Sequence, residues 1–231
     1  MAQTWHQLLF AHWPVPQSQM GRLRALVPPG LPLDLFEKEA WLGVIPFTMT
    51  GVRPRWVPSI PFFSSFHELN VRTYVARDGK PGIFFFSLDA SNRLAVALAR
   101  RSYHLPYFNA RMSLELDGSR VHYSSSRQDR GSPSAELEGS YGPIASVLSA
   151  KEGSLDAWLT ARYCLYAVDK HGRMYRGEID HPPWPLQRAE AEIKKNTMAS
   201  PLGLSLPDTE PLLHFARHMD VKVWPLERVL V

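Results

Sequence analysis

Between residues 67 and 75 the chain alternates strictly between two sets of side chains. The first and mostly apolar set is His67, Leu69, Val71, Thr73 and Val75. The second set, which we call the polar face, is Glu68, Asn70, Arg72 and Tyr74. A period of two is typical of a β-strand, because successive side chains point to opposite faces. We therefore predict a strand whose two faces differ in chemistry.

Two apolar runs flank this strand. Residues 40–48 and 82–88 are rich in apolar, β-branched and aromatic side chains, which favours strands buried on both faces. Asp78 and Gly79 precede the second run and indicate a hairpin turn. The polar-faced strand and the run over 82–88 are therefore expected to form an antiparallel hairpin.

The rest of the chain predicts shorter elements. A helix capped by Asp89 or Ser91 must end before Pro106, because the residue before proline avoids the helical region. Further strands are predicted in a meander over 109–141, a hairpin over 162–168 and 173–180, and one or two strands over 211–224. Further helices are predicted over 2–12 and after Ser154. Residues 22–36 are expected to form a loop, and 186–195 a polar helix or an edge strand.

These elements amount to about nine strands and three helices by pattern rules. Most strands are joined by hairpins, so the expected fold is α+β with a largely antiparallel sheet. No linker interrupts the pattern, and we expect residues 1–231 to form a single domain.

Composition and charge restrict the classes of protein that remain. Hydrophobic residues make up 45% of the chain and charged residues 21%, which indicates a globular protein rather than a disordered one. The net charge is +4, and no basic cluster is longer than two residues, so nucleic-acid binding is not expected. One cysteine, Cys164, excludes an intrachain disulfide and favours a reducing compartment. With no signal peptide or membrane-spanning run, we expect a cytoplasmic protein that binds no membrane, as a monomer or homodimer.

Several familiar sites are missing from the sequence. It contains no G-x-G-x-x-G, Walker, H-E-x-x-H, C-x-x-C or G-x-S-x-G motif, so no cofactor is expected. His214 and His218 would share a helix face and could bind zinc there, but their segment fits a strand equally well. No carboxylate or cysteine ligand lies near them in the sequence, and no metal is expected.

The polar face is the first candidate site, and two interpretations of it are open. It could be a solvated face with a weak ion pair between Glu68 and Arg72. Alternatively, it could line a closed cavity, with Glu68 as a general acid or base and Arg72 as a clamp for a carboxylate. The second interpretation is favoured by the aromatic residues that crowd the region: Phe62, Phe63, Phe66 and Phe84 to Phe86.

Two further segments carry candidate ligand-binding residues. Tyr103, His104 and Tyr107 lie between the predicted helix and the next strand, where side chains can reach the mouth of a pocket. They could equally be core residues. Arg53 lies at the start of a proline-rich loop and could bind an anion, although a solvated loop arginine is the commoner outcome.

Four segments resemble the uncharacterised DUF2071 family, the YqjF-like proteins (COG2071). They are Trp41 to Phe47, Gly51 to Pro54, Phe66 to Val75 and Tyr103 to Tyr107. The resemblance runs over nearly the whole chain, and the Glu-Leu-Asn-Val-Arg-Thr-Tyr-Val segment is specific. That family is similar in fold to acetoacetate decarboxylase. The resemblance implies a curved, mostly antiparallel sheet that closes into a cone-like β-barrel around a cavity, with helices outside.

The resemblance also implies what this chain lacks. Acetoacetate decarboxylase carries an Arg-Glu-x-Phe-Gly-Tyr-Pro-Lys-Lys segment, in which the first lysine forms a Schiff base. When this segment is laid on Arg100 to Phe108, its two lysines fall on Tyr107 and Phe108. An upstream glutamate of the enzyme falls on Glu68. Decarboxylation through a Schiff base at this position is therefore not expected here.

Three functions stay open from the sequence. The first is a protein with a pocket for a small organic acid, or for another small polar-aromatic ligand, inside the barrel. Its site residues would be Glu68, Arg72, Arg53, Asn70, Tyr74, Tyr103, His104 and Tyr107. The second is a non-catalytic interaction or structural protein that kept the fold. The third is a lyase that acts without a Schiff base. A lyase that uses another lysine is disfavoured, because Lys38, Lys80 and Lys151 lie in predicted loops or turns and are poor candidates.

Overall fold

The computed structural model describes residues 1–53 and 64–229, and strands dominate it. The strands are β1 (Ala2–Pro14), β2 (Trp41–Arg53), β3 (Phe66–Arg77), β4 (Lys80–Ala90), β5 (Tyr107–Asp117), β6 (Arg120–Arg127), β7 (Glu136–Pro143), β8 (Cys164–Val168), β9 (Met174–Asp180), β10 (Gln187–Asn196) and β11 (Leu212–Arg228). The α-helices are α1 (Met20–Leu26), α2 (Arg93–Tyr103) and α3 (Leu155–Thr160). Short 3-10 turns occupy Gln17–Gln19 and Ser200–Leu202.

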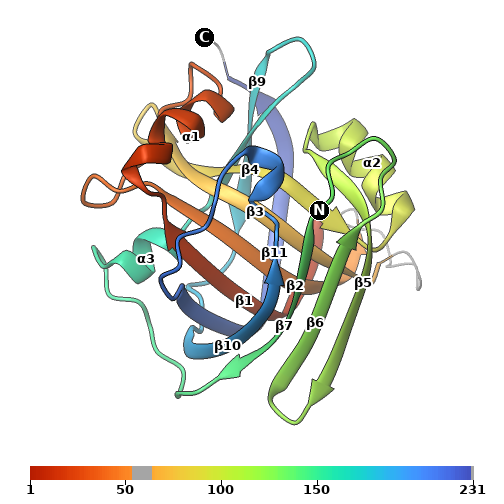
Figure 1. The fold of residues 1–231 in the computed structure, drawn as a ribbon. Helices are drawn as coiled ribbons and strands as arrows, with labels where there is room; N and C mark the ends of the chain where they lie inside the picture. Colours follow the sequence, from red (N-terminus) through yellow and green to blue (C-terminus); the bar gives the residue numbers. More distant parts are fainter. Residues whose placement is uncertain (54–63, 230–231) are drawn as a thin grey trace.

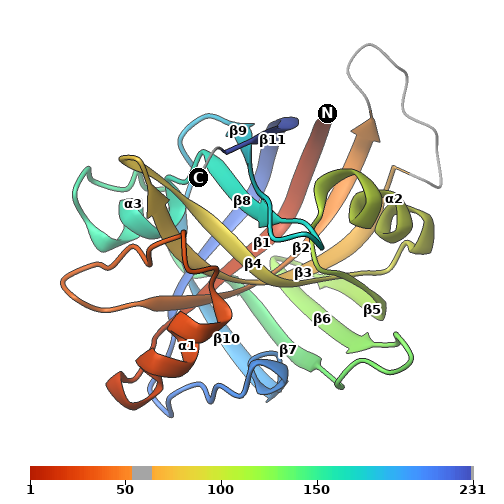
Figure 2. The same cartoon turned by 90° about the horizontal axis from the view of Figure 1, so that it is seen from above.

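The strands close into a ring (Figures 1 and 2). The closed path is β1-β2-β3-β4-β8-β9-β11, because β4 pairs with β8 and β11 pairs back to β1. All of these pairs are antiparallel except β4 with β8. The expectation of a largely antiparallel sheet curved around an interior is confirmed.

A second group of strands covers part of the outside of this ring. Strands β5, β6, β7 and β10 form antiparallel neighbours that leave the ring at β4 and rejoin it at β11. In Figure 1, β7 and β10 lie in front of β1 and β2. One apolar cluster fills the layer between the two groups, with Leu9, Val44, Leu69, Val71 and Tyr141 among its members.

A separate apolar cluster, which we call the interior cluster, lines the inside of the ring. Its members include Phe10, Phe47, Tyr74, Phe85 and Leu165, each from a different strand. The wall formed by β1, β2 and β3 is therefore buried on both faces. This burial explains why residues 40–48 are apolar without alternation.

The first strand corrects the helix predicted over residues 2–12. Trp5, Leu8 and His12 have helical spacing, but β1 is held by β2 on one side and β11 on the other. Gln7 has a φ of 53° and lies in a break of the β1–β2 register, as in a β-bulge. The extra residue at the bulge puts Trp5 and Leu8 on the same inner face, three positions apart. From Leu8 onward the period of two resumes with Phe10 and His12.

Other predicted elements need smaller corrections. The loop expected over 22–36 begins within α1, and the segment 186–195 is the strand β10. Helix α2 is capped by Asn92, whose side chain accepts hydrogen bonds from the amides of Leu94 and Ala95, rather than by Asp89 or Ser91. The C-terminal segment is one long strand, β11. Phe62 and Phe63 lie outside the described residues.

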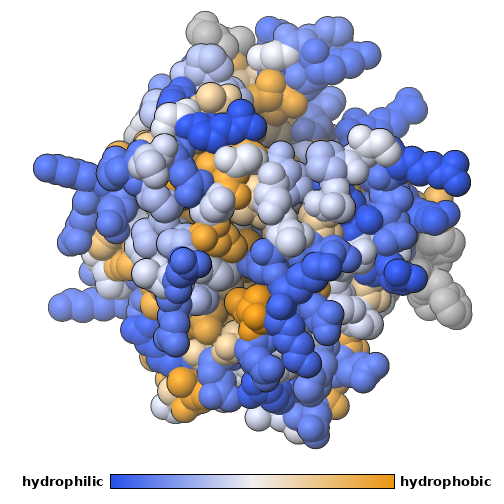
Figure 3. Space-filling model, viewed as in Figure 1, coloured by the Kyte–Doolittle hydropathy of each residue, from blue (hydrophilic) through white to orange (hydrophobic). Residues whose placement is uncertain are grey.

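The surface shows no large apolar face in the view of Figure 3. Hydrophobic atoms there form small patches separated by hydrophilic side chains. Among the helices of the described residues, none is long and apolar enough to cross a membrane.

Candidate functional site

The polar face of β3 points into the interior of the ring. Glu68, Asn70, Arg72 and Tyr74 are all buried, with exposed fractions of 7% or less. Their β4 neighbours are the interior-cluster residues Ala90, Leu88, Phe85 and Ile83. The solvated interpretation of this face is therefore wrong, because four polar side chains lie within an apolar core.

The side chain of Glu68, on the inner face of β3, is held by Tyr107, the first residue of β5. The Tyr107 hydroxyl donates a hydrogen bond of 2.9 Å to Glu68 Oε2. Burial raises the pKa of Glu68 from an ordinary 4.5 to about 8, against the lowering effect of the Tyr107 hydrogen bond, and the charge of Asp89 adds to the rise. Glu68 is thus mostly protonated at pH 7, and its carboxyl group can donate a hydrogen bond.

Arg72 is the most unusual member of the polar face. Its guanidinium carbon lies 5.5 Å from the ring centre of Phe10 and 5.7 Å from that of Tyr74. Within residues 1–53 and 64–229 it has no ion pair, and its buried Nε has no hydrogen-bond partner. The Oδ1 atom of Asn70 is also buried without a partner there. Such groups in a native interior call for an explanation, because buried charges are usually paired.

A second arginine, Arg162, contacts the ring of Tyr74 from a part of the chain that is distant in sequence. Arg162 lies 5.0 Å from the ring centre of Tyr74 and 4.3 Å from that of Trp158. Its Nη1 donates to Asp34 Oδ2 at 2.5 Å, while its Nη2 is buried without a partner in the described part of the chain. The ring of Tyr74 therefore contacts the guanidinium groups of Arg72 and Arg162. Of these two arginines, only Arg162 has a carboxylate partner among the described residues.

His12, which is hydrogen-bonded to Tyr74, is uncharged. His12 Nε2 and the Tyr74 hydroxyl are joined by a hydrogen bond of 2.6 Å. Burial holds the pKa of His12 well below its ordinary 6.5, and the charges of Arg72 and His214 lower it further. Neutral His12 fixes the orientation of Tyr74, and the interior keeps an excess of positive charge from the arginines.

The other predicted ligand residues are divided among different places. Tyr103 is half-buried at the end of α2 and packs on the interior cluster, as Tyr107 does. His104 lies outside, with its ring centre 5.0 Å from that of Tyr175. Arg53 is exposed at the end of β2, ten residues beyond Gly43, which pairs with Arg72. The structure thus brings Tyr107 to Glu68 of the polar face and Tyr103 near Tyr107, but neither His104 nor Arg53.

Tyr107 and Phe108 begin β5, and their side chains go to opposite sides of the sheet. Tyr107 turns inward to Glu68. Phe108 packs under Arg127, 3.9 Å from its guanidinium carbon, and Arg127 makes a two-bond ion pair with buried Asp89 at 2.7 and 2.8 Å. All seven lysines lie in the described residues, and none of them is buried.

The sequence analysis missed His12, Asp34 and Arg162. His12 lies within an apolar run that was assigned to a helix. Arg162 and Asp34 are 128 residues apart, so no local pattern connects them. Asp89 was interpreted as a helix cap, and its ion pair with Arg127 also depends on a distant strand.

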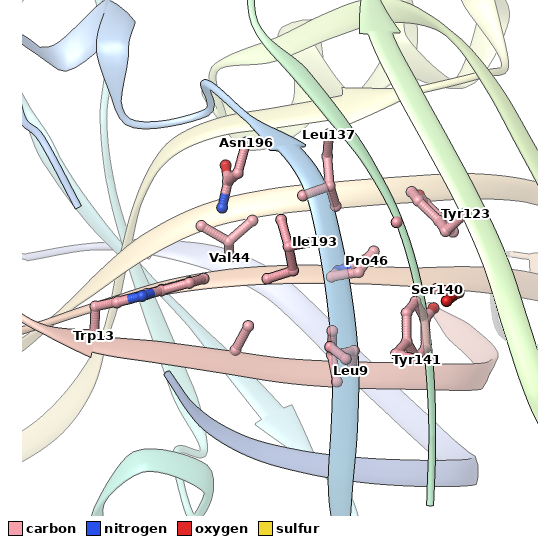
Figure 4. Close-up of a pocket in the computed structure, with 13 residues that line it drawn as sticks. Leu9, Trp13, Val44, Pro46, Tyr123, Leu137, Ser140, Tyr141, Ile193 and Asn196 are labelled. Atoms are coloured by element: carbon pink, nitrogen blue, oxygen red, sulfur yellow. The ribbon is translucent and has the colours of Figure 1, made fainter. Parts of the chain in front are cut away.

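Two other places in the described structure do not form a site. Figure 4 shows a small cavity between β1, β2, β7 and β10, lined mainly by apolar side chains, with a volume of about 20 Å³. That space is comparable to one water molecule. His214 lies 3.2 Å from Asp156, whereas His218 is exposed, and no group of three or more metal-ligating side chains occurs among the described residues.

Comparison with known proteins identifies relatives along the whole chain. A family model described as "DUF2071: Uncharacterized conserved protein (COG2071)" matches residues 2–220. The chain is 48% identical over 228 residues to "Uncharacterized protein YqjF" of Bacillus subtilis (strain 168), covering 99% of this chain and 92% of that protein.

Solved structures share the fold at low sequence identity. An acetoacetate decarboxylase structure aligns with a TM-score of 0.66 and 17% identity, covering 99% of this chain and 89% of the other. The enduracididine biosynthesis enzyme MppR, complexed with pyruvate, aligns with a TM-score of 0.65 and 10% identity, covering 98% and 89%. At these identities the likeness is one of fold.

Proposed function

The chain belongs to the DUF2071 family, and we propose that it binds a small organic acid inside the ring of strands, with Arg72 holding the carboxylate. The observation that carries the proposal is the uncompensated charge of Arg72. A guanidinium group presents a planar fork of donors that matches a carboxylate. A bound carboxylate would supply the partner that no described side chain offers.

Glu68 supports the same ligand class because it does not compete for Arg72. A charged glutamate four residues before Arg72 on the same face would be the obvious partner for the guanidinium. With its pKa raised to about 8 by burial, Glu68 is mostly neutral at pH 7 and repels an incoming carboxylate little. Its carboxyl proton can instead be donated to an oxygen of the ligand, and the amide of Asn70 lies between the two groups.

The surroundings indicate an acid with an apolar or aromatic body. Phe10, Phe85 and Tyr74 belong to the interior cluster around Arg72. A structural neighbour with the same fold is described as complexed with pyruvate, so the fold can hold a small carboxylate. The proposed site uses no lysine and hence no Schiff base, since residue 107 is a tyrosine and no lysine of the chain is buried.

Binding of benzoate and pyruvate at pH 6.5, measured by calorimetry, tests the proposal. Benzamide is the matched neutral control, and we expect benzoate to bind at least tenfold more tightly, because hydrogen bonds to a charged group contribute about 1.5–3 kcal/mol. Arg72→Met should remove that preference. Arg111→Met, at an exposed position on β5, should keep it. Equal binding of benzoate and benzamide, or full affinity in Arg72→Met, would contradict the proposal and favour a non-catalytic interaction protein.

A second candidate function is a lyase, or a related acid–base enzyme, that acts on the bound acid without a Schiff base. The observation that favours it is the proton held on Glu68 beside Tyr107. The test is exchange of the pyruvate methyl protons with solvent deuterium, followed by proton NMR. If the protein accelerates the exchange and Glu68→Gln abolishes this acceleration, catalysis is supported. If the exchange is no faster than in buffer, the protein binds the acid without acting on it.

A further inference from the structure

The ring of strands is split at one edge of β4. Along that edge, Ile83 and Phe84 pair with β8, and residues 88–90 pair with β5. Strands β8 and β5 both run parallel to β4, and they pair with separate parts of its edge. Residues 85–87 pair with neither of them, so the two strands leave a fork at Phe85.

A groove of about 800 Å³ lies over this fork. Its wall includes Phe84 and Phe86, which point outward, and also Phe85, Leu105 and Ala167, which belong to the interior cluster. The groove therefore reaches from the surface to the side chains that enclose the interior. Its lining includes residues of α2 and of the turn of the β8–β9 hairpin, two elements that are neighbours in the view of Figure 2.

The floor of the groove adjoins the polar face. Phe85 is the direct cross-strand partner of Arg72 in the β3–β4 register. Side chains opposite each other on the same face of such a pair have Cβ atoms about 4.5–5.5 Å apart. Rotation of Phe85 and Leu105, whose exposed fractions are 8% and 9%, would thus open the fork directly onto Arg72.

The rim of the groove is basic. Arg100, Arg101, Lys170 and Arg173 line it, and Asp169 is the single acidic residue among the described lining residues. Asp169 is already bonded to Arg173, and Arg100 is paired with Asp129. Arg101 and Lys170 are exposed and have no ion pair within residues 1–53 and 64–229. Their charge is available to attract an anion, and a cleft lined by one sign of charge concentrates ligands of the opposite sign.

We propose that the fork between β5 and β8 is the entrance through which organic acids reach Arg72, and that Arg101 and Lys170 steer these anions into it. This inference rests on the proposed function, because it assumes a carboxylate site inside the ring. It adds the route to that site and the reason for the preference for anions.

The first test measures how fast benzoate binds, by stopped-flow tryptophan fluorescence at low ionic strength. Arg101→Glu/Lys170→Glu should lower the association rate constant about tenfold and leave the dissociation rate constant unchanged. The difference in association rate constant between the double variant and the unmodified protein should nearly vanish at about 0.5 M salt. The matched control is Lys38→Glu/Lys151→Glu, which changes the net charge equally at exposed positions outside the groove. Equal rates in the two double variants would overturn the steering.

The second test blocks the fork without changing the site. Lys170→Cys is labelled with a bulky maleimide; Cys164, the single native cysteine, is buried. Relative to unlabelled Lys170→Cys, a label at the entrance should slow association and dissociation by the same factor and leave the equilibrium constant unchanged. Labelled Lys151→Cys should behave as the unlabelled protein does. Unchanged rates in labelled Lys170→Cys would overturn the entrance.

The two proposals fail in different ways. If benzoate binds with the preference that depends on Arg72, but neither the charge reversals nor the label changes its rates, the entrance lies elsewhere and the proposed function stands. If benzoate and pyruvate do not bind the unmodified protein, the proposed function falls, and the entrance falls with it.

Discussion

Arg127 and Arg72 both have buried side chains, and their surroundings differ. Arg127 forms two hydrogen bonds with Asp89 and lies over the ring of Phe108. Arg72 lies against two rings, Phe10 and Tyr74, but no carboxylate among the described residues faces it. Both guanidinium groups have been removed from bulk water, yet only one has been given a counter-charge.

This difference separates a structural arginine from a binding one. A buried ion pair whose geometry satisfies both partners can hold two strands in place, as Arg127 of β6 does with Asp89 of β4. A buried arginine without a partner costs stability and is retained for another reason. The folding of this chain thus tolerates an unfavourable charge on β3, which is typical of a functional site.

The largest expected effect comes from breaking the matched pair. Arg127→Met leaves the Asp89 carboxylate buried without its cationic partner, and it should lower the free energy of unfolding by about 3–5 kcal/mol. Urea unfolding at pH 7 measures the loss. The control is Asp89→Leu/Arg127→Met, which removes both charges and should be less destabilising than Arg127→Met alone. A double variant that is less stable than Arg127→Met would contradict this account, because Asp89 would then stabilise the fold even without Arg127.

Arg72→Met should behave in the opposite way. It removes a charge without leaving a carboxylate unpaired, and the loss of its contacts with two rings is offset by the lost cost of burying the charge. The free energy of unfolding without ligand should stay within about 1 kcal/mol of that of the unmodified protein. A loss as large as that of Arg127→Met would mean that Arg72 has a structural partner and would weaken the proposed site.

The sequence predicted the polar face but not the completed site. The strict alternation from His67 to Val75 settled which side chains share a face, and the aromatic residues around it indicated that this face is enclosed. These signals are local, because period two and aromatic density can be counted along one strand. Tyr107 was not among these local signals, because the next strand was predicted to begin at residue 109, whereas β5 begins at Tyr107.

The partners of the polar face were not predictable, because each comes from a distant strand or loop. His12 reaches Tyr74 across 62 positions and Arg162 reaches Asp34 across 128. The bulge at Gln7 also hid the strand that carries His12. No single-sequence pattern encodes which strands close the ring, and therefore none reports which charges remain unmatched inside it.

Glu68→Gln should change how stability depends on pH. The pKa of Glu68 is about 8 in the folded protein and near the ordinary 4.5 in the unfolded chain, so between these values the folded state holds an extra proton. Unfolding then releases a proton, and the stability of the unmodified protein falls as pH rises, by at most about 1.4 kcal/mol per pH unit. The glutamine variant lacks this decline, so its advantage over the unmodified protein should grow between pH 5 and pH 8.

Urea unfolding across that pH range measures this effect, with Glu115→Gln at an exposed position as the control. Curves that run parallel for Glu68→Gln and the unmodified protein would mean that Glu68 titrates normally. The same titration bears on binding, since ionised Glu68 repels an anion. Benzoate affinity should therefore fall above pH 8 in the unmodified protein and not in Glu68→Gln.

The smallest effect is expected from Tyr107→Phe, which tests the link between the residue at position 107 and Glu68. The variant loses one hydrogen bond, so its stability should fall by about 1 kcal/mol. The Tyr107 hydroxyl lowers the pKa of Glu68, so its loss should move the titration of Glu68 to higher pH. The carbon-13 signal of the Glu68 carboxyl group reports that shift directly. Tyr103→Phe, beside Tyr107, should leave the titration in place, and an equal shift in both variants would show that the hydroxyl of Tyr107 acts through packing and not through its hydrogen bond.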